Sequence, residues 1–327
     1  MSNIETFNLT KKFNGITAVD NLNIKVEEEE IFGLLGPNGA GKTTTLSMLC
    51  TIVKPTSGKA LVNGFDIIKK AEDVRKSIGI VFQDPSLDNR LTARENLQTH
   101  AALYDVPEDI AEDKIDELLN LVELNERAND LVKTFSGGMK RRLEIARGLI
   151  HMPKVLFLDE PTLGLDPQTR EHIWNYIEKV CDEEKITVII TTHYMDEAER
   201  LCNRIGIIDH GKIVAIGKPR EMIDQIGNEI VTLRIDDISK ADKFRSLDFV
   251  KNIMVSSVVN LVVENGSESI PKIFEFANKN DIKILSLETH NPTLNDVFLH
   301  YVGGDIREEK SSGKDTMKLR LKLRDRI

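Results

Sequence analysis

Residues 36–44 read G-P-N-G-A-G-K-T-T, and they follow the apolar run Ile31–Leu35 and precede a helical stretch over residues 43–50. A tight, glycine-rich loop that leaves a strand and enters a helix aims successive backbone N–H groups at one point, where an anion can bind. The order strand, loop and helix therefore predicts a phosphate-binding loop, and a nucleotide is the ligand that this loop suits.

The loop assigns roles to its side chains as well as to its backbone. We expect Lys42 to reach the β- and γ-phosphates of ATP and Thr43 to offer its hydroxyl to Mg²⁺, while the glycines let the backbone approach closely. The predicted nucleotide-binding residues of this segment are Gly36, Asn38, Gly39, Ala40, Gly41, Lys42, Thr43 and Thr44.

Composition limits the classes of protein to consider. The 327 residues are enough for two domains, and 53 acidic against 44 basic residues give a net charge of −9, which argues against a nucleic-acid partner. The three cysteines show neither metal-site nor disulfide spacing, which is typical of a reducing cytosol. We expect a chain that is soluble by itself, since no apolar run approaches the length of a membrane span and no signal peptide is visible.

Hydrophobic periodicity separates two kinds of strand. Leu22, Ile24 and Val26 alternate with polar residues, which predicts antiparallel strands with one covered face. Residues 78–82, 155–158 and 186–190 are nearly continuous apolar runs, which suit parallel strands buried on both faces.

Between residues 92 and 150 the pattern is helical. We predict a helical subdomain over about 88–150, inserted into the α/β core, whose apolar stripes serve packing. One such stripe consists of Ile110, Ile115, Leu118, Leu119 and Val122.

Two further segments carry chemistry. Asp159 and Glu160 end a buried strand, where Asp159 is expected to hold Mg²⁺ and Glu160 to orient or deprotonate an attacking water. Ser136, Gly137 and Gly138 precede a helix, and they make a second anion site from exposed N–H groups and the positive end of the helix dipole.

With these segments in this order, the chain resembles the nucleotide-binding subunit of an ABC transporter, whose signature usually reads L-S-G-G-Q. Here the signature reads F-S-G-G-M, and the thioether of Met139 cannot replace the hydrogen bonds of an amide. The resemblance implies a P-loop NTPase fold of α/β class: an ABC-type nucleotide-binding domain with an antiparallel β subdomain, a parallel-sheet core and a helical subdomain, followed by a smaller α+β C-terminal domain.

The resemblance also implies roles for residues outside the loop. Phe13 matches the aromatic residue that stacks on adenine, and Gln83 matches the glutamine that touches Mg²⁺ and the attacking water and links the ATP site to the membrane partner. His193 matches the histidine that contacts the γ-phosphate, and Asp166 matches the loop through which two subunits communicate.

Partners follow from the same resemblance. Two copies are expected to form a homodimer head to tail, so that Ser136, Gly137 and Gly138 serve the phosphate loop of the other copy. The segments F-S-G-G-M-K-R-R (135–142) and T-T-H-Y-M-D-E-A-E (191–199), with N-P-T-L-N-D-V-F-L (291–299), are similar to the daunorubicin-resistance type of exporter ATPase. This implies export of a drug, antibiotic or lipid-like substrate through a separate integral-membrane permease at the cytoplasmic face of the cell membrane. The alternative is a soluble, non-transport ABC-type ATPase that acts as a nucleotide-gated switch.

The division of the chain follows changes of pattern. We expect a nucleotide-binding domain over 1–226, a ferredoxin-like α+β domain over 227–304 and a basic, disordered tail over 305–327. The order expected in the second domain is β-α-β-β-α-β, with its first helix over residues 240–249. A final helix is expected to place Leu294, Val297, Phe298 and Tyr301 on one face and to stop at Gly303.

Overall fold

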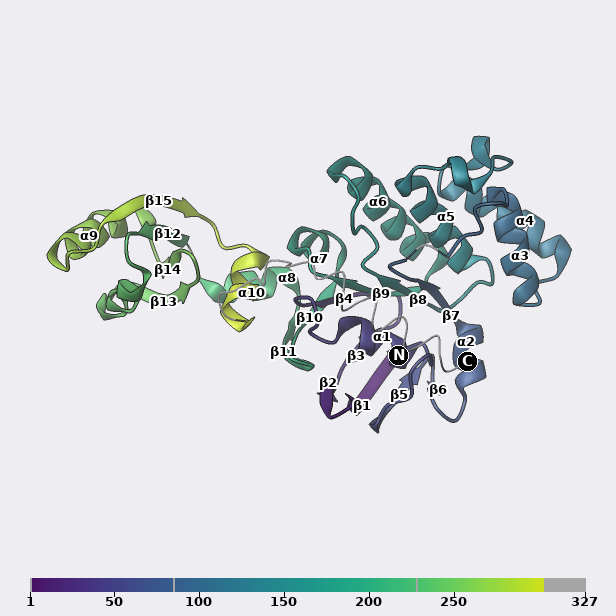
Figure 1. Cartoon of the computed structure of the whole chain (residues 1–327), viewed down its shortest axis with the longest axis horizontal. Helices are drawn as coiled ribbons and strands as arrows, with labels where there is room; N and C mark the ends of the chain where they lie inside the picture. Colours follow the sequence, from purple (N-terminus) through teal and green to yellow (C-terminus); the bar gives the residue numbers. More distant parts are fainter. Residues whose placement is uncertain (1, 85, 228, 303–327) are drawn as a thin grey trace.

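The computed structural model describes residues 2–84, 86–227 and 229–302, and it contains three β-sheets with helices packed against them (Figure 1). Gly303 and the tail over 305–327 lie outside the described residues. No helix in the described ranges has both the length and the apolar character needed to cross a bilayer.

An antiparallel sheet opens the chain, as predicted from the alternating pattern. Its order is β2-β1-β5-β6, with β3 also paired to β1, and the side chains of Leu22, Ile24 and Val26 are buried beneath it. The strands are β1 (Ser2–Phe13), β2 (Ile16–Leu22), β3 (Lys25–Glu27), β5 (Ser57–Val62) and β6 (Phe65–Asp66).

The central sheet has the order β11-β10-β4-β9-β8-β7, in which every neighbouring pair is parallel except β10 with β11. Every residue of β4, β8 and β9 is buried, as expected for strands covered on both faces. Because β4, β7, β8 and β9 are parallel, the residues that follow them meet at one edge of the sheet. The strands are β4 (Ile31–Leu35), β7 (Ile78–Val81), β8 (Val155–Asp159), β9 (Thr187–Thr192), β10 (Arg204–Asp209) and β11 (Lys212–Gly217).

Helices pack around this sheet, and those between β7 and β8 form the predicted helical region (Figure 1). Its predicted stripe is correct for Ile115, Leu118, Leu119 and Val122 but wrong for Ile110, which is 45% exposed while Ala111 is buried. The helices are α1 (Lys42–Leu49), α2 (Ala71–Ser77), α3 (Ala93–Leu103), α4 (Glu108–Leu121), η1 (Asn125–Arg127), η2 (Val132–Thr134), α5 (Gly137–Leu149), α6 (Pro167–Glu184), α7 (Met195–Leu201) and α8 (Pro219–Ile226).

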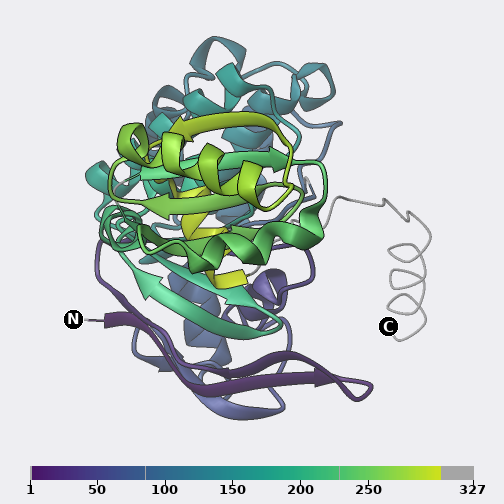
Figure 2. The ribbon, with the colours of Figure 1, turned by 90° about the vertical axis from the view of Figure 1, so that its left-hand side faces the viewer.

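The C-terminal part holds an antiparallel sheet of order β13-β14-β12-β15, seen in front in Figure 2. A 3-10 helix, η3, stands where we expect an α-helix. Its buried Ala241 and Phe244 and the partly buried Leu247 recur every three residues, which is the period of a 3-10 helix. The elements are β12 (Glu229–Ile235), η3 (Ile238–Ser246), β13 (Val250–Val255), β14 (Val259–Val263), α9 (Gly266–Lys279) and β15 (Ile284–His290).

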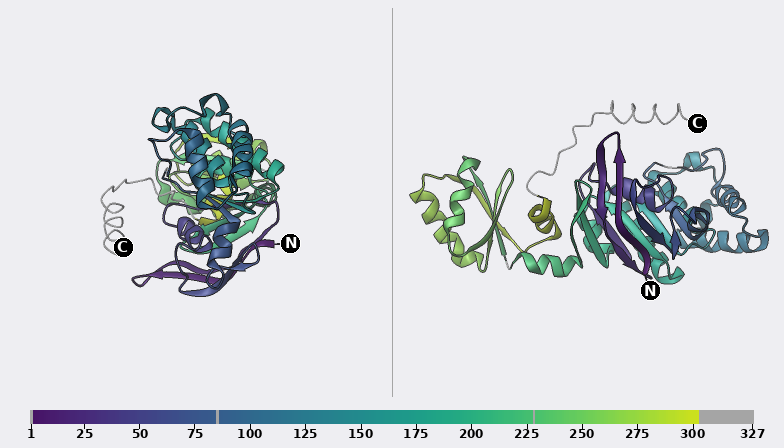
Figure 3. Two further views of the ribbon diagram at one scale, coloured as in Figure 1. Left: turned by 90° about the vertical axis from the view of Figure 1, so that its right-hand side faces the viewer. Right: turned by 90° about the horizontal axis from the view of Figure 1, so that it is seen from below.

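The last described helix, α10 (Leu294–Val302), returns from this sheet and packs on α7, α8, β10 and β11 (Figure 3). Leu294, Val297 and Phe298 are buried in the apolar core of the N-terminal part, whereas Tyr301 is 38% exposed and does not continue the predicted face. The helix that follows the C-terminal sheet thus completes the core of the part that precedes it.

Candidate functional site

The phosphate loop connects β4 to α1, and its backbone leaves no room for side chains at two glycines. A Cβ at Gly36 would lie 2.3 Å from the carbonyl oxygen of Ile208, and one at Gly41 would lie 2.5 Å from that of Ala18. Gly41 and Gly39 also have φ angles of +110° and +79°, in the left-handed region that glycine adopts most readily. The glycines therefore shape a loop whose N–H groups, with the start of α1, can surround an anion.

Lys42 is the cation of this loop, and it is 5% exposed. Its Nζ donates hydrogen bonds to the carbonyl oxygens of Gly36 (2.7 Å) and Pro37 (3.2 Å) and lies 3.4 Å from Oε1 of Glu160. Burial lowers the pKa of Lys42, and the charge of Glu160 opposes this shift. The ammonium group is thus held at the loop by partners within the chain.

Asp159 and Glu160 face the loop from the end of β8. Oδ1 of Asp159 accepts hydrogen bonds from Oγ1 of Thr43 (3.2 Å) and from Oγ1 of Thr191 on β9. Burial raises the pKa of Asp159, and these two hydroxyl donors act against that shift. The carboxylate is therefore tied both to the phosphate-loop helix and to the neighbouring strand.

Glu160 has a φ of +46°, which costs a residue with a Cβ about 1 kcal/mol or more. Its backbone N–H is held by the carbonyl and hydroxyl oxygens of Thr191, both at 3.1 Å. Although burial raises the pKa of Glu160, His193 and Lys42 together hold it below its usual value. The side chain is thus kept as a carboxylate, the form that can accept a proton.

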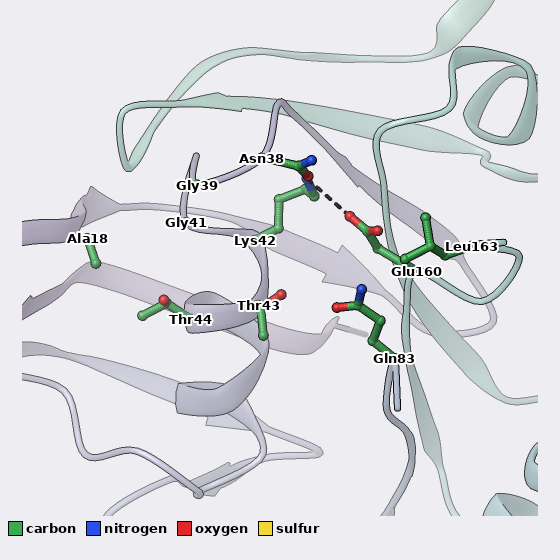
Figure 4. A pocket seen from close by; sticks show the side chains of 10 residues that line it. All are labelled: Ala18, Asn38, Gly39, Gly41, Lys42, Thr43, Thr44, Gln83, Glu160 and Leu163. Atoms are coloured by element: carbon green, nitrogen blue, oxygen red, sulfur yellow. Dashed lines mark ion pairs between the residues drawn. The ribbon is translucent and has the colours of Figure 1, made fainter. Parts of the chain in front are cut away.

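Gln83 and His193 come from the ends of two further strands, β7 and β9. Gln83 is exposed and its amide points into the same space as Lys42 and Glu160 (Figure 4). Nδ1 of His193 lies 3.2 Å from Oε1 of Glu160, and it has no hydrogen-bond partner among the described residues. Four strand ends therefore contribute to one group of polar side chains.

These residues surround a cavity of about 320 Å³ (Figure 4). Asp159, His193, Gly36 and Ala40 are not among its lining residues, but Asp159 is bonded to Thr43 and His193 lies beside Glu160, and both of these partners line it. Ala18 and Leu163 line it although the sequence singled out neither as a binding residue, since their apolar side chains carry no chemical signal. The lining consists of Ala18, Asn38, Gly39, Gly41, Lys42, Thr43, Thr44, Gln83, Glu160 and Leu163.

Phe13, the predicted adenine-stacking residue, is not among the residues that line this cavity. It ends β1, its side chain is 44% exposed, and Nζ of Lys11 lies 4.7 Å from the centroid of its ring. The ring is thus accessible to a planar partner, and its role as the adenine contact stays a prediction.

The signature turn forms a separate site. Ser136 is the N-cap of α5, where its Oγ accepts a hydrogen bond from the N–H of Met139 at 3.3 Å. The turn opens into a second cavity of about 220 Å³, which shares no lining residue with the first. A Cβ at Gly137 would meet only Cδ2 of Leu165, at 3.6 Å, so the chain itself leaves space there. Within one chain, therefore, the two predicted phosphate sites do not meet.

Asp166 lies close to this second site as the N-cap of α6. Its carboxylate accepts hydrogen bonds from the N–H (3.0 Å) and Oγ1 (2.6 Å) of Thr169, and Thr169 lines the second cavity. These hydrogen bonds lower the pKa of Asp166. Asp166 thus follows Glu160 closely in the sequence and bonds to a residue that lines the cavity at the signature turn.

The oxygen atoms beside the phosphate loop suit a hard cation. Thr43 and Asp159 present a hydroxyl and a carboxylate 3.2 Å apart, with the amide of Gln83 on the same cavity. No group of three His, Cys, Asp or Glu side chains in the described residues could hold a metal ion by itself. This donor set fits Mg²⁺, which commonly binds one or two protein oxygens together with substrate phosphates and water.

Arg141 is a buried residue of the site that sequence reasoning missed. It lies on α5, and its guanidinium donates to backbone carbonyls beside both Gln83 and Glu160. The only sequence signal was an arginine among the charged residues after the signature, which has the appearance of a solvent-facing position.

Comparison with known proteins identifies two families along the chain. Residues 19–163 match the family model described as ABC transporter, and residues 217–302 match the model described as ATP-binding protein DrrA1-3-like, C-terminal domain.

Curated relatives match over nearly the whole chain. Linearmycin resistance ATP-binding protein LnrL of Bacillus subtilis is 38% identical over 311 residues, which cover 93% of this chain and 100% of the relative. Daunorubicin/doxorubicin resistance ATP-binding protein DrrA of Streptomyces peucetius is 35% identical over 92% of each chain. Nod factor export ATP-binding protein I of Cupriavidus metallidurans is 37% identical over 92% of this chain and 97% of its own.

Solved structures agree with these matches. The cbiO1 protein of Clostridium perfringens, part of the ABC transporter complex cbiONQ, is 31% identical with a TM-score of 0.65 and covers 68% of this chain and 91% of its own. The ATP-binding cassette MJ0796, in a dimeric post-hydrolysis state bound to ADP and Pi, is 30% identical with a TM-score of 0.58 and covers 66% and 98%. The chain therefore belongs to the ABC transporter family as an ATP-binding, ATP-hydrolysing subunit that is homologous to the ATPases of drug-resistance exporters.

Proposed function

We propose that the chain drives the export of a drug, antibiotic or lipid-like substrate through a separate permease at the cytoplasmic face of the membrane. It works as a homodimer that closes on ATP and opens after hydrolysis. The observation that carries this proposal is that the phosphate loop and the signature turn open into different cavities of one chain. A second copy, related head to tail, would bring a signature turn to each phosphate loop.

In this proposal the residues that line the first cavity or lie beside it have different roles in hydrolysis. Lys42 binds the β- and γ-phosphates, Glu160 orients the attacking water and accepts its proton, and His193 contacts the γ-phosphate. Thr43, Asp159 and Gln83 would hold Mg²⁺, which neutralises phosphate charge when it is bound. The carboxylate state of Glu160, favoured by Lys42 and His193, supports its role as the base.

The remaining assignments extend this proposal. Phe13 stacks on the adenine, and Ser136, Gly137 and Gly138 contact the γ-phosphate of the nucleotide on the other copy through backbone N–H groups. The domains divide at residue 226, and α8 and α10 join the C-terminal sheet to the motor. Similarity along the whole chain to named resistance and export proteins favours this proposal over a soluble nucleotide-gated switch.

The experiment uses Glu160→Gln. Removing the base is expected to slow ATP turnover by about 10²-fold or more, while ATP still binds and holds the dimer closed. Light scattering after size-exclusion chromatography should therefore detect a dimer of this variant with ATP and Mg²⁺, and a monomer with ADP or without nucleotide.

Two outcomes would contradict the proposal. Normal turnover by Glu160→Gln would remove Glu160 from its role as base. A variant that binds ATP but stays monomeric would remove the shared site. Lys42→Ala with Glu160→Gln in one chain is the matched control, because it should lose the ATP-dependent dimer together with the nucleotide.

A further inference from the structure

Arg141 joins three segments of the site from a buried position on α5. It is 6% exposed, and its Nε donates to the carbonyl oxygen of Pro161 at 2.7 Å. One terminal nitrogen donates to the carbonyl oxygen of Phe82, at 2.5 Å, and the other to that of Asp159, at 3.1 Å. The guanidinium therefore binds the backbone just before Gln83 and on both sides of Glu160.

Glu144, one turn further along α5, balances this charge. It is 1% exposed, and its Oε2 lies 3.2 Å from the guanidinium of Arg141 while its Oε1 accepts the N–H of Ser86 at 2.7 Å. Arg147, on the next turn, donates to the carbonyl and hydroxyl oxygens of Ser86. Three side chains on successive turns of α5, those of Arg141, Glu144 and Arg147, thus hold the loop that contains Gln83.

Three of the hydrogen bonds that Arg141 donates end on backbone carbonyl oxygens, so these contacts fix the course of the chain. Glu160 has a positive φ, and such a conformation persists only when its surroundings hold it in place. Thr191 holds the N–H of Glu160, while Arg141 holds the carbonyl groups immediately before and after it. A buried charge is costly unless its hydrogen bonds are satisfied, and the guanidinium meets this requirement by joining these segments.

We propose that Arg141 is a positioning residue for ATP hydrolysis: it sets Gln83 and Glu160 relative to α5, the helix that begins at the signature turn. Movement of α5 as the dimer closes is then passed to the base and to Gln83 through one side chain. This inference rests on the proposed function, because it concerns the same hydrolytic site.

The test is Arg141→Lys, which keeps the charge beside Glu144 but replaces a rigid fork of three donor nitrogens with a single nitrogen on a flexible stem, so it cannot span the three carbonyl groups at once. A positioning role predicts that kcat falls about tenfold or more, since small misplacements of catalytic groups are costly. ATP affinity, measured by fluorescent-nucleotide titration, should stay within about twofold, because the hydrogen bonds of Arg141 go to Phe82, Asp159, Pro161 and Glu144 and not to the phosphate loop. Backbone amide exchange should become faster at residues 82–84 and at Ser86, whose N–H is bonded to Glu144.

Arg94→Lys is the matched control. Arg94 on α3 also pairs with two carboxylates, those of Glu112 and Asp116 on α4, but these contacts touch neither Gln83 nor Glu160. It is expected to keep kcat within about twofold of the unaltered chain. Glu144→Gln is the second variant: it keeps an oxygen for the N–H of Ser86 and should lower kcat less than Arg141→Lys.

The outcomes distinguish a positioning role of Arg141 in hydrolysis from a role in stabilising the fold alone. A structural role alone predicts a lower melting temperature and fewer ATP-binding chains, with unchanged kcat per binding site, and this result would overturn the inference. Unchanged kcat in well-folded Arg141→Lys would overturn it as well. If the unaltered chain hydrolyses ATP and Glu160→Gln does not, either result counts against Arg141 and leaves the proposed function standing.

Discussion

The phosphate-loop site and the signature turn are both helix starts suited to an anion, yet they are built differently. The first is filled with buried, mutually paired groups: Lys42 lies 3.4 Å from Glu160, and Asp159 is 4% exposed and bonded to Thr43. The second consists of a capped helix start where Ser136 and Gly137 are exposed. The first is preorganised by its own chain, whereas in the proposed dimer the second meets its ligand only on another copy.

The largest effect is expected from Lys42→Ala, which tests the phosphate-loop site. It removes the loop's cation, and a hydrogen bond to a charged group is worth about 1.5–3 kcal/mol, or roughly 10- to 150-fold in affinity. Fluorescent-nucleotide titration should show that loss of ATP affinity. Lys76→Ala, which removes an exposed lysine paired with Glu72 on α2, is the control and should bind ATP normally. Unchanged affinity in Lys42→Ala would count against the loop as the phosphate site.

Gly137→Ala tests the second site without disturbing the fold. The added Cβ meets only Leu165 within its own chain, and alanine favours a helix more than glycine does, so the melting temperature should stay the same or rise slightly. In the dimer the methyl group would stand where the helix start approaches the nucleotide of the other copy. Overpacking of about 1–3 kcal/mol would lower the ATPase rate by about 5- to 150-fold.

Mixing two variants sharpens the same test. A chain with Gly137→Ala retains its phosphate loop, and a chain with Lys42→Ala retains its signature turn. A mixed dimer therefore contains one intact composite site, and the mixture should hydrolyse ATP faster than the average of the two separate variants. A rate equal to that average would show that the signature turn does not act on a second copy.

The sequence was sufficient for the features that depend on local pattern. Continuous apolar runs predicted the buried strands, and the spacing of the phosphate loop predicted a turn between β4 and α1, because neighbouring residues determine both. The contact between Lys42 and Glu160 agrees with the rule that parallel strands end at one edge of the sheet, although no contact between these two residues was predicted.

Features set by distant contacts could not be predicted. Arg141 bonds to Phe82, 59 residues away along the chain, and nothing near Arg141 in the sequence announces that partner. Ile110 fits the helical spacing of its stripe, but it lies in the first turn of α4 beyond the edge of the core. Likewise, α10 is amphipathic from its sequence, and only the fold shows that its apolar face completes the N-terminal core.

The smallest effect is expected from Met139→Gln, which restores the usual signature residue. Met139 packs partly against the apolar core, and its N–H is bonded to Ser136 whatever its side chain. A neutral hydrogen bond is worth about 0.5–1.5 kcal/mol, so the gained amide contact and the lost thioether packing should nearly cancel, and the ATPase rate should change by no more than about threefold. Steady-state ATPase assays at saturating ATP measure this directly. A large loss would show that the side chain of Met139, and not only the backbone of the turn, is part of the site, because the capped helix start would be intact in both chains.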